Sequence, residues 1–342
     1  MRRTAVLVSA LTLAALGTTL SPAHAEPGPI HDDTQVTSFS GQEQDAALEF
    51  WTTARLRAAK DVAVTPATGG AAAPSAAPSS APADDGPELT VPPIPDPALA
   101  ADRLADPARV SARASSPTAW KRGGLIRKTS GKVFFQSAEG TLFACSATVA
   151  GSRNKSVVLT AAHCVVDPAT GKGYRKWVFI PGYAHGRRPF GTFTAQKLFH
   201  PKRYVTSGSR DNWDFAFARM RKLDGRTLAG TVGAQGIRFN SPTGRHVHSF
   251  GYGGTPAEGN GERLNHCQGK EHADPTRPGS TMWGIDCVQS FGASGGGFLA
   301  GFKEATGSGY LVGNISVGNG TTEFHPRLGN EAKKLYRKAS RG

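Results

Sequence analysis

Short apolar runs, separated by Gly, Pro and Asn turns, follow one another through the chain from Trp120 to Gly342. Runs of this length, rich in β-branched and aromatic residues, predict β-strands, and many of them at regular spacing favour a sandwich or barrel. The region is long enough to bury a core with two lobes. The predicted strands are 132–136, 142–149, 156–160, 177–181, 192–199, 214–220, 246–252, 281–288, 297–302 and 310–317.

A single helix is predicted at the end of this region. The stretch 327–341 places Leu328, Ala332, Leu335 and Tyr336 at helical spacing. The predicted fold is therefore all-β with one C-terminal helix.

The first 25 residues have the features of an export signal. Arg2 and Arg3 precede an apolar segment, and Ala23-His24-Ala25 has the small-x-small pattern of a signal-peptidase site. We expect cleavage after Ala25 and a secreted protein. A membrane anchor is the alternative, but the apolar segment is shorter than the ~20 residues that a spanning helix needs. We therefore expect no membrane span.

Residues 26–118 differ in composition from residues 119–342, which we take as a separate domain. Between Glu43 and Val62, apolar residues recur at a spacing that suits one amphipathic helix. From Thr65 to Ser116 the chain is rich in Ala, Pro, Gly and Ser, which predicts a largely disordered linker.

Charge divides the chain at the same place. Residues 26–118 contain 6 Lys+Arg and 13 Asp+Glu, whereas residues 119–342 contain 32 and 13. The acidic segment is either an intramolecular pro-segment that docks on the basic domain and delays its activity, or a solvated spacer. The basic surface favours solubility over specific binding of a polyanion, and no nucleic-acid motif accompanies it.

Three side chains have the chemistry of nucleophilic catalysis. His163 ends a β-type run, Asp214 precedes an apolar one, and Ser294 lies in Gly292-Ala293-Ser294-Gly295-Gly296-Gly297. A serine hydroxyl becomes a nucleophile when a histidine takes its proton, and a buried carboxylate orients that histidine. Asp211 is the alternative carboxylate, but it lies in a polar run.

These stretches resemble the signature blocks of the trypsin-like serine proteases. The matching runs are TAAHC around His163, DFAFA from Asp214, GASGGG around Ser294 and CSATV from Cys145. The resemblance covers about residues 119–342 and is nearest to the secreted actinobacterial branch related to V8-like and glutamyl endopeptidases. It implies two six-stranded antiparallel barrels with the site between them, and hydrolysis of peptide bonds through an acyl-enzyme.

The four cysteines of this exported chain predict disulfides, and the sequence alone allows three pairings. The resemblance implies a bond between Cys145 and Cys164, which leaves Cys267 with Cys287. A zinc site is the competing use of these residues, but no cysteine has a C-x-x-C partner. We expect no metal and no other cofactor.

The resemblance also assigns residues to substrate binding. It places the oxyanion hole at the amides of Gly292 and Ser294, and one pocket wall at Ser316, Val317 and Gly318. Val288 stands where trypsin-like enzymes carry an acid, and Ile315 stands near the histidine of glutamate-specific relatives. Both departures favour an apolar or small substrate side chain. Glu323 is expected to be a solvated turn residue; the alternative is an inward carboxylate that selects a basic side chain.

Two departures affect the serine loop. Ala293 stands where digestive enzymes have the aspartate that captures a new amino terminus, which V8-like enzymes also lack. Gly297 replaces a common proline. The favoured function is a secreted monomeric serine endopeptidase that acts on proteins or peptides. A catalytically inactive binding protein for anionic surfaces is the main alternative. An esterase is disfavoured by the order His, Asp, Ser and by the lack of a G-x-S-x-G elbow.

Overall fold

The structure is a computed structural model that describes residue 1 and residues 33–62, 86–95 and 114–341. Residues 2–25 of the predicted signal peptide lie outside the described residues, as do 65–85 and 96–113 of the predicted linker. All helices and strands belong to the unit Asp33–Gly342. None of the helices in this described part is long and apolar enough to cross a membrane.

Six antiparallel strands close into the first barrel. They are bonded in the order β9-β10-β7-β6-β5-β8, and β8 also pairs with β9, which completes the ring. Aromatic and aliphatic side chains such as Val133, Phe179 and Leu198 fill the interior, and the aromatic and β-branched ones among them are typical of pleated, buried sheets. The strands are β5 (Ser130–Gln136), β6 (Leu142–Ala150), β7 (Val157–Thr160), β8 (Arg175–Pro181), β9 (Phe193–Pro201) and β10 (Ala216–Met220).

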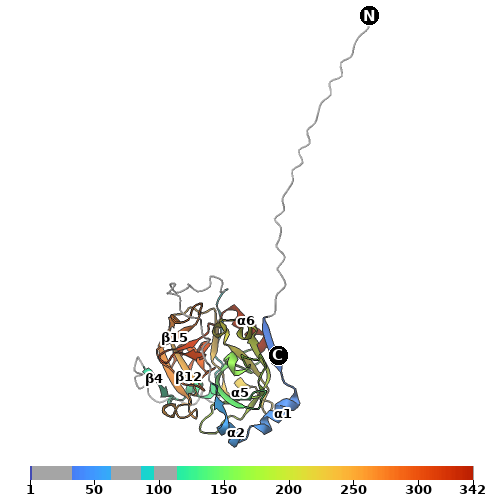
Figure 1. The fold of residues 1–342 in the computed structure, drawn as a ribbon, viewed down its shortest axis with the longest axis vertical. Helices are drawn as coiled ribbons and strands as arrows, with labels where there is room; N and C mark the ends of the chain where they lie inside the picture. Colours follow the sequence, from blue (N-terminus) through green and yellow to red (C-terminus); the bar gives the residue numbers. More distant parts are fainter. Residues whose placement is uncertain (2–32, 63–85, 96–113, 342) are drawn as a thin grey trace. The chain divides into compact units, whose positions relative to one another are not determined.

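A second lobe is built on a seven-stranded sheet of order β3-β11-β17-β16-β12-β13-β4, with a smaller sheet of order β14-β15-β19-β18. Figure 1 labels β4, β12 and β15 of this lobe. Its strands are β3 (Leu89–Val91), β4 (Ala114–Ala119), β11 (Gly236–Phe239), β12 (His246–Gly251), β13 (Asn265–Lys270), β14 (His272–Ala273), β15 (Trp283–Ile285), β16 (Gly297–Lys303), β17 (Ser308–Asn314), β18 (Val317–Gly318) and β19 (Glu323–His325).

Short helices connect these strands, and a longer one ends the chain. The last helix, α6 (Asn330–Ser340), packs on β9, β10 and β11 through Leu335 and Tyr336, and the Tyr336 hydroxyl donates to the Gly151 carbonyl at 2.6 Å. The predicted C-terminal helix is confirmed. The closed six-stranded antiparallel barrel beside a second β-lobe confirms the predicted all-β class with two β-lobes. The connecting helices are α3 (Gly124–Thr129), η2 (Ala162–Cys164), α4 (Arg203–Thr206), η3 (Arg210–Trp213), α5 (Leu228–Val232) and η4 (Pro256–Glu258).

Each predicted strand overlaps an observed one, but two differences affect the site. Strand β10 begins at Ala216, so Asp214 lies in a turn before the strand and not within it. Strand β15 ends at Ile285, so Val288 lies in the loop that leads to Ser294.

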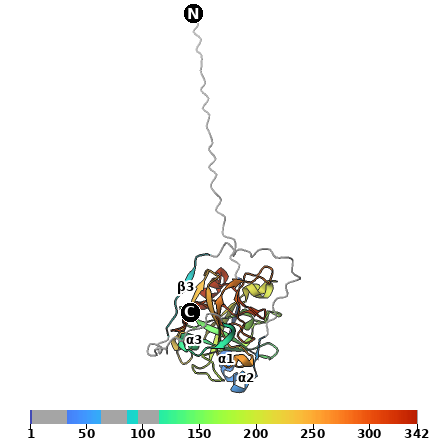
Figure 2. The same ribbon diagram turned by 90° about the vertical axis from the view of Figure 1, so that its left-hand side faces the viewer.

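The helix predicted between Glu43 and Val62 is two helices, α1 (Gly41–Phe50) and α2 (Thr53–Ala58). The break follows from capping, because the Thr52 side chain accepts from the Arg55 amide and so starts a new helix. Trp51 lies between the helices. Part of the predicted linker also has regular structure: β3, labelled in Figure 2, pairs with β11. Strand β4, which begins within the predicted linker, pairs with β13.

The N-terminal segment, residues 33–62, packs on the first barrel (Figure 1). Strand β1 (Thr34–Ser38) pairs antiparallel with β9, helix α1 contacts β8 and β9, and β2 (Lys60–Asp61) pairs parallel with β6. Trp51 is 1% exposed, its ring lies 5.6 Å from that of Phe134, and its indole N–H donates to the Lys176 carbonyl at 2.6 Å.

We predict that Trp51→Ala lowers the free energy of unfolding of the full chain by about 3–5 kcal/mol, the usual cost of deleting a buried Trp. Glu49→Ala, at an exposed position of α1, should change it by less than about 0.5 kcal/mol. Denaturant titration of both variants tests this. Equal stability of the two variants would contradict the packing described here.

Candidate active site

His163 lies in η2, directly after the buried strand β7. Two contacts of the next residue hold this turn in place. Cys164 is disulfide-bonded to Cys145 in β6, and the Cys164 carbonyl accepts from the Trp177 indole N–H at 2.8 Å. His163 itself is 1% exposed. The histidine is therefore held on a rigid element at the end of a strand.

Asp214 follows η3 and points its carboxylate at His163. Its Oδ2 lies 2.7 Å from His163 Nδ1, and its Oδ1 accepts from the His163 backbone N–H at 2.9 Å. A third donor comes from the second lobe, where the Ser316 hydroxyl reaches Asp214 Oδ2 at 2.5 Å. The Asp214 carbonyl accepts from Asn314 Nδ2 at 2.9 Å. Both lobes therefore hold Asp214.

These contacts determine the charge state of the pair. Burial alone would raise the pKa of Asp214, but the His163 imidazole and the hydrogen bonds from His163 and Ser316 lower the pKa below its usual value. The ionised carboxylate can only accept, so Nδ1 of His163 carries the proton. Nε2 of His163 is buried and has no hydrogen-bond partner among the described residues. Its lone pair is thus available to accept a proton.

Ser294 lies in a loop whose shape depends on glycine. Gly292 and Gly295 have φ angles of 94° and 85°, a region that side chains with a Cβ rarely adopt. A Cβ on Gly295 would also lie inside contact distance of the Ser146 carbonyl. The Ser146 amide donates to the Ser294 carbonyl at 2.7 Å, and the Ser146 hydroxyl donates to the Gly292 carbonyl at 2.8 Å. Strand β6 therefore fixes both ends of this turn.

The amides at the predicted oxyanion hole are not used elsewhere. Neither the Gly292 nor the Ser294 N–H donates to another group in the described part of the chain. Two backbone amides free to donate in a glycine loop form a site that can stabilise an oxyanion.

The structure brings Ser294 into the same region as the His163–Asp214 pair. Its carbonyl lies 3.8 Å from Cys164 Sγ, in the residue next to His163. Its hydroxyl makes no hydrogen bond with His163 Nε2 in this structure. Such hydrogen bonds are often long before substrate binds and shorten in the reacting complex.

Asp211, the alternative carboxylate, has a different partner. It is also buried, but it forms an ion pair with Arg277 at 3.0 Å. Arg277 also pairs with Asp274 at 2.6 Å. Asp211 thus belongs to a separate ion-pair network, and Asp214 is the carboxylate that contacts His163.

Of the four residues assigned to the substrate pocket, only Val288 and Gly318 lie against one another. A Cβ on Gly318 would lie 3.4 Å from Val288 Cγ1, so these two positions face one another. The Val317 side chain packs with Met282 and Phe324 in a small core cluster. Ser316 has a role that the sequence did not reveal, because its hydroxyl binds Asp214.

The expectation that Glu323 is a solvated turn residue is wrong. Glu323 lies in β19 and is 1% exposed. Pairing of β19 with both β15 and β18 places it inside the second lobe, and neighbouring polar groups satisfy its carboxylate there. Pairing of this kind joins separated segments, so the local composition around Glu323 does not reveal it.

The cysteine pairs are those implied by the family resemblance. Cys145 is bonded to Cys164, and Cys267 is bonded to Cys287. One group of potential metal ligands among the described residues contains His163 with Cys145 and Cys164, but the two sulfurs are joined to one another and are not free to bind an ion.

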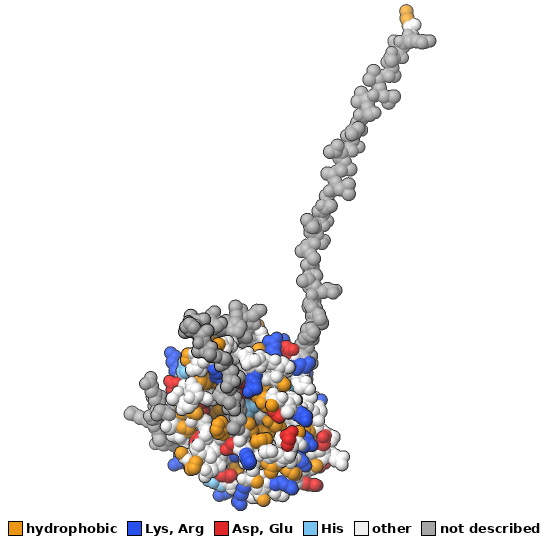
Figure 3. All heavy atoms as spheres, viewed as in Figure 1, with side chains coloured by type: hydrophobic (Ala, Val, Ile, Leu, Met, Phe, Trp, Pro, Cys, Tyr) orange, Lys and Arg blue, Asp and Glu red, His pale blue; other side chains and the backbone are white. Residues whose placement is uncertain are grey.

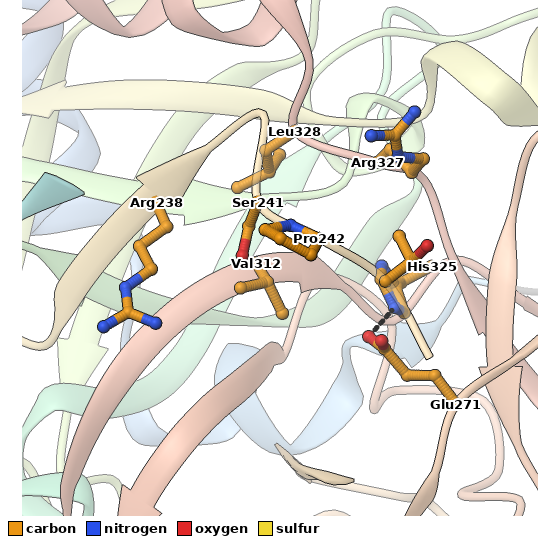
Figure 4. A pocket seen from close by; sticks show the side chains of 9 residues that line it. Arg238, Ser241, Pro242, Glu271, Val312, His325, Arg327 and Leu328 are labelled. Carbon is orange, nitrogen blue, oxygen red and sulfur yellow. Dashed lines mark hydrogen bonds and ion pairs between the residues drawn. The ribbon is translucent and has the colours of Figure 1, made fainter. Parts of the chain in front are cut away.

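Several hollows lie in the described surface. The one of about 610 Å³, between η3 and α6, and a smaller one of about 130 Å³ contain none of His163, Asp214 and Ser294. A cleft of about 530 Å³ contains His163 together with Lys60, Asp61 and Val62 of the N-terminal segment, a volume typical of ligand sites. The hollow in Figure 4 surrounds the buried Glu271–His325 pair, whose atoms are 3.0 Å apart. Its cavity of about 10 Å³ is too small for a ligand. The cleft beside His163 is therefore the candidate site.

Comparison with solved structures gives clear matches. The chain is 33% identical to the protease Anisep from Arthrobacter nicotinovorans, with a TM-score of 0.60 over 66% of this chain and 99% of that one. It is also 33% identical to the thermostable serine protease AL20 from an extremophilic microorganism, with a TM-score of 0.56 over 63% and 97% of the two chains. A Glu endopeptidase at 20% identity, with a TM-score of 0.52 over 66% and 96%, is similar in fold. No protein-family model and no protein of curated function matches the chain.

The Asp214 contacts predict a pH-dependent contribution to stability. Because its pKa is lower in the folded protein than its usual value of 3.8, the ionised carboxylate stabilises the fold above that pH. This contribution is lost as the pH falls through the folded pKa. Asp214→Asn should therefore lower the free energy of unfolding at pH 7 by about 1.5–3 kcal/mol, with a smaller difference in acid.

Chemical denaturation at a series of pH values measures this effect. Asp224→Asn, which changes an exposed turn residue, is the matched control and should behave as the unchanged protein does. A difference between the Asp214→Asn and unchanged proteins that is the same at every pH would contradict the assigned charge state.

Proposed function

Because the chain belongs to the chymotrypsin-fold bacterial serine proteases related to V8-like enzymes, we propose that it is a secreted endopeptidase that uses Ser294, His163 and Asp214. The observation that supports this most directly is the 2.7 Å contact between Asp214 Oδ2 and His163 Nδ1, with Nε2 left without a partner. A histidine held in this way is a ready general base.

The proposed reaction has two halves. His163 Nε2 accepts the proton of the Ser294 hydroxyl as Oγ attacks the peptide carbonyl, and the same proton then passes to the leaving amine. Asp214 keeps the ring in the required tautomer and stabilises the imidazolium. Water then attacks the acyl-enzyme by the same route and restores the serine.

The negative charge that develops on the attacked carbonyl oxygen is stabilised by the Gly292 and Ser294 amides. Removal of one such donor typically costs about 10²–10³ in kcat. Gly292 contributes because its φ of 94° aims the amide without strain from a Cβ. No cofactor takes part in this scheme.

Export completes the proposal. The signal sequence at residues 1–25 directs the chain out of the cell, where an oxidising environment preserves the two disulfides. Outside the cell the enzyme acts as a monomer on protein or peptide substrates.

The N-terminal segment acts in this proposal as an intramolecular inhibitor. Asp61 and Val62 line the same cleft as His163, and a Cβ on Gly292 would lie 2.6 Å from Asp61 Oδ1. Burial raises the pKa of the Asp61 carboxyl, and the nearby Lys132 ammonium opposes that rise. Because the Asp61 carboxylate lies against Gly292, it occupies space next to the proposed oxyanion hole. A substrate carbonyl therefore cannot bind at that position while the segment is in place.

The backbone of the segment supports the same role. Lys60 and Asp61 pair with Phe143 and Ala144 of β6, and the Val62 amide donates to the Ala144 carbonyl at 3.3 Å. Extended peptides commonly bind by adding a strand to a sheet edge. The segment therefore occupies an edge of β6, next to Cys145, that is otherwise open to strand addition by an extended peptide.

The alternative function, an inactive protein that binds anionic surfaces, has less support. On the face shown in Figure 3, Lys and Arg side chains are dispersed among other kinds of side chain and form no continuous patch. Interspersed charges of this kind favour solubility over a specific polyanion site.

Labelling with a fluorophosphonate probe tests the proposed nucleophile. The processed protein should be modified at Ser294, and Ser294→Ala should abolish both labelling and peptide hydrolysis. Loss of the serine from a working triad lowers kcat by on the order of a millionfold. Ser290→Ala, a serine four residues away in the same loop, should retain both. An unlabelled processed protein would favour the binding-protein alternative.

Addition of the separate segment 26–118 to the processed enzyme tests the inhibitor role. We expect inhibition at low salt, weakened at least about tenfold by Trp51→Ala, because that ring is the main buried anchor of the segment. The Glu49→Ala segment is the control and should inhibit as the unchanged segment does. No inhibition at low salt would show that the segment is a spacer.

A further inference from the structure

A buried carboxylate that the proposed reaction does not use lies beside the serine loop. The Glu323 side chain accepts hydrogen bonds from the Ser249 hydroxyl and, at 3.0 Å, from the Gln289 amide. Gln289 Nε2 in turn donates to the Ser249 hydroxyl at 3.1 Å. All of these donors are neutral. Among the described residues no Lys, Arg or His is paired with this carboxylate.

Glu323 is held between the two segments assigned to the substrate pocket. Across the β18–β19 ladder it pairs with Gly318, which lies two residues after Ser316. Its other neighbour is Gln289, which follows Val288 in the loop that leads to the serine. Val288 and Gly318 face one another. The carboxylate is thus at the junction of both walls.

A carboxylate in this position is poorly compensated. Burial, with a smaller contribution from a second buried carboxylate, Glu258, raises the pKa of Glu323 to about 7, although the hydrogen bonds from Ser249 and Gln289 oppose that rise. Glu258 accepts from the Ser290 amide at 3.0 Å. The adjacent Gln289 and Ser290 amides therefore each donate to a different buried carboxylate. Burying a charge is costly unless an opposite charge accompanies it. A cation beside Glu323 would offset that cost.

We propose that Glu323 is the specificity residue of this protease and binds a Lys or Arg side chain at P1, the substrate residue whose carbonyl Ser294 attacks. This inference rests on the proposed peptidase function and replaces the expectation of an apolar or small P1 residue that Val288 suggested. An acidic P1 residue is excluded by repulsion from Glu323 and Glu258. An apolar residue binds without relieving the unpaired charge.

Peptides that differ only at P1 test this proposal. The full chain is expressed, and the naturally processed enzyme is assayed on substrates with Lys, Arg, Leu or Glu at P1. We expect kcat/KM for Lys and Arg to exceed that for Leu by about 100-fold, the usual scale for a buried charge pair. The Glu substrate should not be cleaved measurably.

Glu323→Gln isolates the charge because it keeps the side-chain size and an acceptor for the Gln289 amide. It should lower kcat/KM for Lys and Arg about 100-fold and leave Leu cleavage within about threefold. Asp286→Asn removes an acid whose side chain is 79% exposed on the segment before Val288, and it should keep the preference for Lys and Arg. Fluorophosphonate labelling of Ser294 in each variant shows that the site is folded.

The outcomes separate this inference from the proposed function. A labelled enzyme that prefers Leu or Glu, or a labelled Glu323→Gln variant that still prefers Lys and Arg, overturns the role of Glu323 and leaves the peptidase proposal standing. An unchanged protein that neither takes the label nor cleaves any of the peptides contradicts the peptidase proposal, and the inference falls with it.

Discussion

The carboxylate of Asp214 accepts hydrogen bonds from both lobes and so links them. It is buried, and its donors are the ring and amide of His163 from the first barrel and the hydroxyl of Ser316 from the second lobe. A buried charge with several donors is stable only while all of them stay in place. Separation of the lobes would leave Asp214 partly unpaired, so this ion also stabilises the docking of one lobe on the other. In the proposed mechanism, the requirements of stability and of catalysis therefore coincide at one residue.

The serine loop is anchored in a similar way from both sides. Ser146 of β6 binds the Gly292 and Ser294 carbonyls, and the Ile315 carbonyl accepts from the Gly295 amide at 2.7 Å. The two disulfides lie close to the functional segments, since Cys164 adjoins His163 and Cys287 opens the loop that leads to Ser294. Rigid supports of this kind keep a catalytic geometry within the narrow limits that it requires.

The sequence predicted the elements that have strong local patterns. Strands such as β5 and β8, rich in β-branched and aromatic residues, and the amphipathic helix α6 were predicted from periodicity alone. Strand β13, with the sequence NHCQGK, was missed because its composition is polar, and β1 was missed because its partner β9 lies far along the chain. Helix propensity did not reveal the break at Thr52. The sequence identified His163, Asp214 and Ser294 as candidate site residues because each lies in a local motif. The burial of Glu323 and the contact of Asp61 with Gly292 could not be predicted, because they depend on pairing between distant segments.

In the proposed mechanism, Ser294 is activated by the His163–Asp214 pair and becomes acylated. Intact-mass measurement of the processed protein, mixed with an excess of an activated ester and quenched within one turnover, tests this most directly. We expect one acyl group per chain, located on the peptide that contains Ser294 and lost as the ester is consumed. A protein that carries no acyl group, or carries one on another residue, would contradict it.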